Sequence, residues 1–289
     1  MTCSRIPARD RSRREHQRRK SRQLEPRRAL LGWARRGPAA DASRRAAAGS
    51  RIDPRGLLVE MVLVVAAVLV YFGVRGLTEG QQATATAHGR DLLAFERVVG
   101  LDVEVTMQSW IVDDQLLVTI ANWVYIWGHW PVIAAVLLWL YGTKPHDYRL
   151  LRNAMFISGA VGVVIFITYP VAPPRLLGAP FIDTITQHSE SYRVLQPPGL
   201  VNKFAAMPSL HAGWNLLIGI SVWRATQHHL LRACAAVSPV AMAAAVVLTA
   251  NHYVIDAIVG FAVALAGFAG SWMLTRTQTT TNNASERAR

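Results

Sequence analysis

The chain has 289 residues, of which 52% are hydrophobic, and its mean hydropathy is positive at +0.22. This composition is too apolar for a soluble domain that must cover itself with charge, and it indicates a membrane protein. A net charge of +13 would suggest nucleic acid as a partner if the charge were spread over the chain. Residues 1–56, however, contain 17 of the 31 Lys and Arg residues against five acids, so the remainder is nearly neutral and we expect no nucleic-acid partner.

Residues 1–56 form a basic segment for which we expect no folded structure. Its Arg residues are clustered with few aliphatic residues between them, so the segment cannot bury enough apolar surface to offset chain entropy. We predict a disordered cytoplasmic tail, which either is simply solvated, reflects an overextended start site, or binds anionic lipid or a partner. The two cysteines, Cys3 and Cys234, have no spacing that indicates a metal or redox pair.

Six apolar segments near the length that crosses a bilayer, about 20 residues, follow this tail. They are residues 57–74, 117–141, 153–169, 210–223, 233–250 and 253–274, the fourth being the shortest. The sequence therefore predicts an all-α fold, a polytopic membrane helical bundle with about six transmembrane helices over residues 57–275. The last residues, 276–289, are expected to form a disordered tail.

Lys and Arg residues between the spans predict the orientation, because short cytoplasmic loops are enriched in them. With six spans, the residues that share one side with the tail are Lys144, Arg149, Arg152, Arg224, Arg232 and Arg276. The N-terminus is then cytoplasmic, and we expect the protein in the cell membrane. Residues 90–111 have apolar positions near helical spacing and are expected to lie flat on the outer surface. The proline-rich segment 170–209 is expected to be an ordered loop.

Three short stretches place polar residues at the extracytoplasmic ends of the predicted spans. They are residues 169–178 (YPVAPPRLLG), 204–215 (FAAMPSLHAGWN) and 249–260 (TANHYVIDAIVG). In the third stretch His252 and Asp256 are four residues apart and share one helix face. A carboxylate there can orient the imidazole and make it more basic, as a nucleophile or general base requires.

The other two stretches contain groups suited to phosphate. Ser209 and His211 follow Pro208, which is expected to begin a helix, and the free N–H groups of a helix N-terminus attract anions. Arg175 follows a rigid proline pair and offers two donors to phosphate oxygens. A single His or Arg at an interface is more often a packed or anchoring side chain. Three ionisable sites that converge near membrane depth are harder to explain by packing and favour a functional site.

The sequence MPSLH, followed downstream by HxxxD and preceded by APPR, resembles the type 2 phosphatidic acid phosphatase (PAP2) superfamily. Within it, the chain looks most similar to the inositolphosphotransferase-like branch, and the resemblance covers about residues 120–275. It implies a mechanism without metal or cofactor, in which a lipid phosphate substrate forms a phosphohistidine. The implied roles are His252 as nucleophile, Asp256 as its orienting partner, His211 as acid and then base, and Arg175 and Ser209 as phosphate ligands.

The sequence departs from the superfamily pattern at its phosphate-binding cations. Thr168 stands where a lysine is expected, and Ala245 and Val246 stand where a Ser-Arg pair is expected. This agrees better with the inositolphosphotransferase-like branch than with typical phosphatases. Lys203 and Asn251 are on the right side to compensate as phosphate ligands, and simple loop or capping roles are the alternative.

Tyr125 and His129 are also four residues apart, beside Trp127 and Trp130 in the second span. Aromatic residues are enriched at membrane interfaces, so the simpler interpretation is an aromatic belt. The alternative, that they belong to the site, comes from the resemblance, because this branch often has a Tyr and a His-Trp pair at this point.

Other functions are weighed against a lipid phosphatase or phosphotransferase. A non-catalytic transporter or scaffold should have polar groups at several depths, whereas here they gather at one face. An intramembrane serine protease would contain GxSG and a zinc protease HExxH, and neither motif occurs. Hydrolysis and head-group transfer to an alcohol share the phosphohistidine step, so the sequence does not distinguish them. The lipid substrate and the oligomeric state also stay open.

Overall fold

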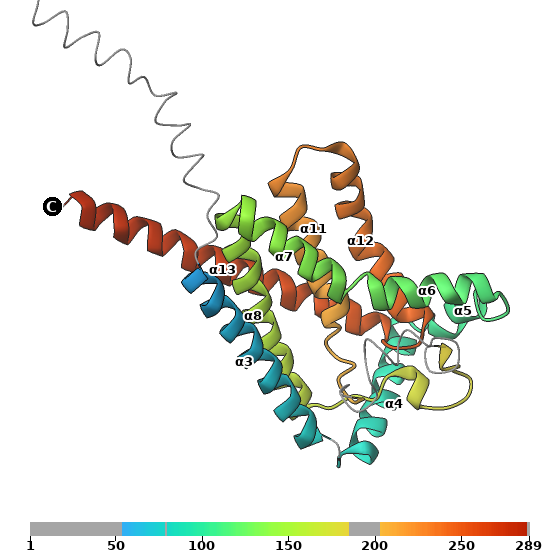
Figure 1. The fold of residues 1–289 in the computed structure, drawn as a ribbon. Coiled ribbons are helices and arrows are strands. Elements are labelled where there is room, and N and C mark those ends of the chain that lie inside the picture. The colour runs from blue at the N-terminus through green and yellow to red at the C-terminus, as the bar shows by residue number, and fades with distance from the viewer. Residues whose placement is uncertain (1–53, 79, 185–202, 288–289) are drawn as a thin grey trace, which may run out of the picture. The chain divides into compact units, whose positions relative to one another are not determined.

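The computed structural model describes residues 54–78, 80–184 and 203–287, and in these ranges the chain is built from helices (Figure 1). In chain order they are α3 (Pro54–Thr78), α4 (Gln82–Val99), α5 (Glu104–Ser109), α6 (Gln115–Trp127), α7 (Trp130–Thr143), α8 (Pro145–Thr168), the short η1 (Pro174–Leu176), α11 (Leu210–Ala225), α12 (His229–Leu248) and α13 (Val254–Arg287). The described residues contain no strand, only an isolated bridge between Val171 and Ala205. The all-α class is therefore confirmed. The predicted tail up to residue 53 and residues 185–202 of the proline-rich segment lie outside the described residues.

Three helices are long and apolar enough to cross a bilayer, namely α8, α12 and the Val254–Arg276 part of α13. The bent pair of α6 and α7 is a fourth if it is counted as one span. The apolar stretch of α3 is shorter, Leu58–Ala67, and α11 has 16 residues. A helix of that length extends about 24 Å, less than the roughly 30 Å of the hydrocarbon core. These helices indicate a multi-pass membrane protein, but the expected six spans are not confirmed.

The second predicted span is two helices, α6 and α7, with an angle of 41° between them. Pro131 lies in the first turn of α7, a position that favours a helix start because proline has no N–H and a fixed φ. His129 precedes this turn with φ −107° and ψ −91°, outside the helical region. The break places His129 inside the bundle, where it is 2% exposed.

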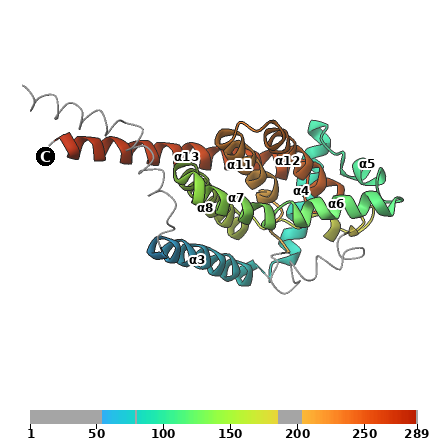
Figure 2. The same cartoon turned by 45° about the horizontal axis from the view of Figure 1, so that its top comes forward.

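Helices α8, α11 and α13 pack against one another, and α12 forms a hairpin with α11 (Figures 1 and 2). Gly213 and Gly260 allow α11 and α13 to cross at close range. A Cβ on Gly213 would lie 2.5 Å from the carbonyl oxygen of Gly260, and a Cβ on Gly260 would clash with the backbone of Ser209. This crossing holds the first turn of α11 against the start of α13.

Basic residues gather at the end of the bundle that is opposite to the starts of α11 and α13. Arg224 near the end of α11 pairs with Asp147 at the start of α8, with 3.6 Å between Nε and Oδ1. The guanidinium groups of Arg224 and Arg276 both lie over the ring of Trp272, at 5.4 and 4.8 Å from its centroid. This arrangement agrees with the predicted alternation of basic turns, while the membrane side that they face stays a prediction.

Two segments differ from expectation. Helix α13 continues to Arg287, although a disordered tail was expected from residue 276, and no Pro or Gly follows Arg276 to interrupt it. The predicted in-plane segment 90–111 is divided into α4 and α5, because Gly100 ends α4 in the left-handed conformation at φ 74°. Helix α4 buries Leu92 on one face and has apolar Val98 85% exposed on another. Its position at the membrane surface stays a prediction.

Candidate active site

His252 lies in the short link between α12 and α13, immediately before the first turn of α13. The N–H groups of Asn251 and His252 both donate to the carbonyl oxygen of Val246, at 3.0 and 3.1 Å. These two bonds fold the link back onto the last turn of α12 and leave His252 only 5% exposed. The backbone therefore fixes the place of the imidazole close to the starts of α11 and α13.

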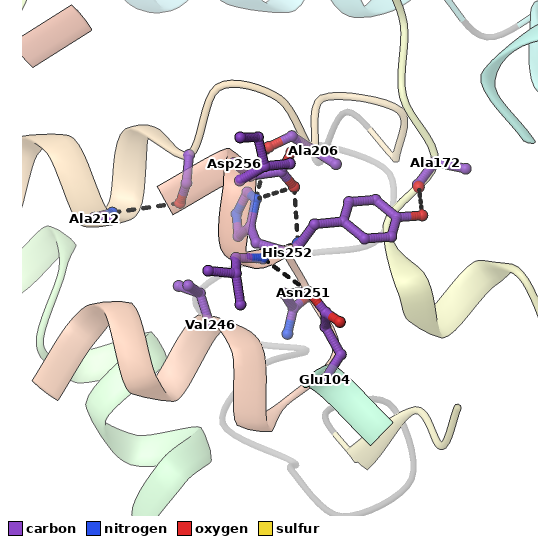
Figure 3. Close-up of polar contacts among 12 residues, drawn as sticks. Glu104, Ala172, Ala206, Ala212, Val246, Asn251, His252 and Asp256 are labelled. Carbon is purple, nitrogen blue, oxygen red and sulfur yellow. Dashed lines mark hydrogen bonds and ion pairs between the residues drawn. The ribbon is translucent and has the colours of Figure 1, made fainter. Parts of the chain in front are cut away.

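One nitrogen of the His252 ring, Nδ1, faces both the carbonyl oxygen of Ala206 and the carboxylate of Asp256 (Figure 3). Nδ1 is 2.7 Å from the Ala206 oxygen and 3.4 Å from Oδ2 of Asp256. Oδ2 also accepts the N–H of Tyr253 at 2.9 Å, and Asp256 is fully buried. The structure thus brings the predicted His–Asp pair together, with the Ala206 carbonyl as the nearer partner of the imidazole.

His211, in the first turn of α11, is packed in a column of rings. Its ring centroid is 4.5 Å from that of Tyr125, 4.0 Å from that of His129 and 6.0 Å from that of His252. Among the described residues, the buried Nε2 atom of His211 has no hydrogen-bond partner. Buried polar atoms are nearly always paired, so this nitrogen is a candidate for contact with a ligand or water. The sequence predicted His211 and His252 at the same membrane face, and the structure brings the two rings together.

Tyr125 and His129 are buried rather than part of an exposed belt. They are 5% and 2% exposed, whereas Trp127 and Trp130 are close to half exposed, as belt residues would be. Asn215, one turn after His211, links the two histidines. Its Nδ2 lies 3.4 Å from Nδ1 of His129 and donates to the carbonyl of His211 at 3.0 Å. The belt interpretation of Tyr125 and His129 is therefore wrong, because both side chains are buried in the bundle.

Ser209 lies two residues before His211, and the backbone of Arg175 contacts the link that carries His252. Ser209 is the N-cap of α11, and its Oγ accepts the N–H of Ala212 at 3.4 Å. The N–H of Arg175 donates to the carbonyl of Ala250 at 3.0 Å, which ties η1 to the His252 link. The guanidinium pairs with Asp183, with 3.4 Å between Nη1 and Oδ2, and within the described residues its buried Nε has no hydrogen-bond partner. Arg175 therefore retains a donor for a ligand.

Lys203 and Asn251 are placed differently from the other predicted phosphate ligands. Lys203 is exposed in the turn before Phe204. Asn251 is buried, and its Nδ2 donates to the carbonyl and the hydroxyl of Thr249, at 3.3 and 2.8 Å. Because these two bonds use both amide hydrogens, the capping alternative suits Asn251 better than phosphate binding.

Two buried acids near the site were missed by the sequence analysis, Glu96 of α4 and Glu104 of α5. They are 0% and 1% exposed and bind backbone N–H groups at the start of α13. A signal was present, because Glu96 follows Leu92 by four residues and so lies on the apolar face of α4. The prediction of an in-plane segment rested on its apolar positions and assigned no role to either acid.

These observations define a multi-pass helical membrane protein whose polar site joins two histidines, an aspartate and an arginine at the ends of helices. Residues 90–270 match the PAP2 superfamily, and because this is well over half of the chain, the protein belongs to that superfamily. No curated protein and no solved structure shows a significant match to the chain. Membership points to a phosphatase-type activity on lipid phosphates. The matched range includes the second half of α4 and all of α5, which the resemblance over residues 120–275 did not cover.

Proposed function

We propose that the protein transfers the phosphate group of a lipid-linked substrate through a phosphohistidine on His252. The observation that carries this proposal is the hydrogen bond of the His252 ring. A carbonyl oxygen only accepts hydrogen bonds, so Ala206 fixes the proton on Nδ1 and leaves the lone pair on Nε2. Asp256, 3.4 Å from Nδ1, stabilises the positive charge that the ring acquires when Nε2 bonds to phosphorus.

The two histidines divide the proton and phosphorus chemistry between them. In the first step Nε2 of His252 bonds to phosphorus, the bond from phosphorus to the leaving oxygen breaks, and protonated His211 gives that oxygen a proton. In the second step the oxygen of water or an alcohol attacks phosphorus, its proton goes to His211, and the N–P bond breaks. A ring separation of 6.0 Å suits this division, because one phosphate group with its leaving oxygen can span it.

The start of α11 is the better phosphate site of the two helix starts that meet here. At α13, the N–H groups of Tyr253, Val254 and Ile255 already donate to carboxyl oxygens. At α11, the N–H of Ala212 is capped by Ser209, while the first N–H groups of a helix have no acceptor within it. An anion would bind these free groups together with Arg175. A phosphate there also favours the protonated form of His211 that the first step needs.

Replacing Arg175 by alanine is expected to lower kcat/KM by about 100-fold, because a charge-assisted bidentate contact is lost. Arg175→Lys should recover only part of this loss, since lysine keeps the charge but not the planar fork. Arg97→Ala is the matched control, because Arg97 forms an exposed pair with Asp102 on the surface of α4. Equal kcat/KM in Arg175→Ala and wild type would remove Arg175 from the proposed site.

The proposed function is tested by phosphate release from a panel of phosphatidic, polyprenyl and sphingoid phosphates, using purified protein in detergent with EDTA present. We expect release from at least one lipid, with turnover unaffected by EDTA. Inositolphosphotransferase-type transfer shares the first step, so an alcohol acceptor and an inositol-bearing phospholipid are added in a second arm. Product only in the second arm would identify a transferase, and no product in either arm would contradict the proposal.

We also propose that the site faces the extracytoplasmic side of the cell membrane. The basic cluster of Arg224 and Arg276 lies at the opposite end of the bundle, and basic turns favour the cytoplasm. In intact cells, an impermeant thiol reagent should label Lys203→Cys and spare Lys144→Cys. The reverse pattern would contradict this orientation.

A further inference from the structure

The buried pair of Glu96 and Glu104 has no part in the steps described above. Oε1 of Glu104 accepts the N–H of Val254 at 3.0 Å, and Oε1 of Glu96 accepts the N–H of Ile255 at 2.7 Å. Because Gly100 ends α4 in a tight left-handed turn, the two acids of α4 and α5 reach the same helix start. Two carboxyl groups from one part of the chain thus bind the helix that carries Asp256.

All three N–H groups that follow His252 are bound by carboxyl oxygens, since Asp256 accepts the N–H of Tyr253 at 2.9 Å. The first N–H groups of a helix have no acceptor within it, so an uncapped first turn frays readily. Here the capped turn begins directly after the reactive histidine. If these three hydrogen bonds loosened, His252 would move relative to the Ala206 carbonyl, because the backbone of the link is continuous with the first turn of α13.

We infer that Glu96 and Glu104 are positioning residues, which hold His252 in its reactive place by fixing the first N–H groups of α13. The inference rests on the proposed function, because the position matters through the reaction of His252. The residue after His252 is also held by its side chain, because the hydroxyl of Tyr253 donates to the carbonyl of Ala172 at 2.9 Å. Gly89 makes room for this contact, since a Cβ there would lie 2.7 Å from the Tyr253 hydroxyl.

Helix α5 also connects this cap with the arginine side of the site. Gln108, one turn after Glu104, donates to the carbonyl of Ile182 at 2.7 Å and accepts its N–H at 3.0 Å. Ile182 precedes Asp183, which pairs with Arg175. One short helix therefore fixes the backbone on both the histidine side and the arginine side.

Burial, and after it the neighbouring Glu104, raises the pKa of Glu96 to about 9. The titratable groups that face Glu96 are Glu104 on α5, Asp256 on α13 and Tyr253 on the link. Below that pKa Glu96 is neutral, and above it Glu96 acquires a negative charge in a buried place, which strains the cap. In the described part of the chain no group of three or more His, Cys, Asp or Glu residues could hold a metal ion, so the pair is assigned to the N–H groups that it binds.

The first measurement is hydrogen exchange of the amides at residues 253–255, followed by mass spectrometry. Glu96→Ala is expected to speed exchange at Ile255 by about tenfold or more, with no change in α8. Glu96→Gln keeps an acceptor oxygen without charge, so it should restore slow exchange. Asp102→Ala, which removes an exposed acid from the segment between α4 and α5, is the control, and its amides should exchange as those of wild type do. Unchanged exchange in Glu96→Ala would overturn the inference whether or not the protein releases phosphate.

The second measurement is the pH profile of kcat on the lipid phosphate that the wild type turns over best. Glu96→Ala is expected to lower kcat by about tenfold or more with KM within about threefold of wild type, because binding groups are unchanged while the nucleophile is displaced. Glu96→Gln should rescue kcat near pH 7 and should lack the fall above pH about 9 that ionisation of Glu96 causes in wild type. If Glu96→Gln does not restore the kcat that Glu96→Ala loses, the positioning role is overturned. It is also overturned if kcat of Glu96→Gln decreases above pH about 9 as that of wild type does. Failure of the proposed function is recognised separately, as a wild type that gives no product.

Discussion

Replacing His252 by alanine is expected to lower phosphate release by at least about 1,000-fold, because the nitrogen that bonds to phosphorus is lost. Activity is measured as phosphate released per folded molecule, with insertion checked by gel filtration in detergent. The ring makes its main hydrogen bond to the carbonyl of Ala206, which lies outside the helices, so we expect the helices of the variant to stay folded.

The matched control for this variant is His146→Ala, because His146 is an exposed histidine near the start of α8. It should release phosphate at the wild-type rate. His211→Ala is expected to lose turnover as His252→Ala does, since both half-reactions need its proton transfer. Full activity in a folded His252→Ala protein would refute His252 as the nucleophile.

Replacing Gly260 by alanine is expected to destabilise the protein by at least about 2 kcal/mol and to lower activity by at least about 100-fold. A Cβ at this position would clash with the backbone of Ser209, which cannot rotate away as a side chain could. Helices α11 and α13 would have to separate, and His211 would move away from His252. The measurements are the unfolding temperature in detergent and the rate of phosphate release.

Gly142→Ala is the control for the helix crossing, because a Cβ on Gly142 of α7 meets no atom within 4 Å. Its unfolding temperature should be equal to or above that of wild type, since alanine favours helix by up to about 1 kcal/mol. If Gly260→Ala unfolds and reacts as wild type does, the close crossing is not what assembles the site.

The parts of the site that could be predicted from sequence are those with a local signal. His252 and Asp256 were found by their four-residue spacing, and Ser209 and His211 by their place at a helix start. Their meeting was inferred from the order of spans, and the 6.0 Å between the two histidine rings agrees with it. The all-α class followed from apolar segments in the same way.

The remaining parts depend on packing and leave little or no trace in a local pattern. The nearest partner of the His252 ring is a backbone carbonyl, that of Ala206, and any residue can supply one. The role of Glu96 depends on the N–H of Ile255, 159 positions away in the chain, which no local pattern indicates. The break before Pro131, which divides the second predicted span into α6 and α7, was missed because hydropathy does not detect it.

The most direct test of the account is to trap the covalent intermediate. Wild type is mixed with phosphatidic acid or polyprenyl phosphate that carries phosphorus-32, and the reaction is quenched with alkali on the millisecond scale, digested and analysed by mass spectrometry. We predict label on the peptide that contains His252, stable in alkali, released by acid, and absent from His252→Ala. Turnover without any labelled protein, or label on a different residue, would contradict the phosphohistidine on His252.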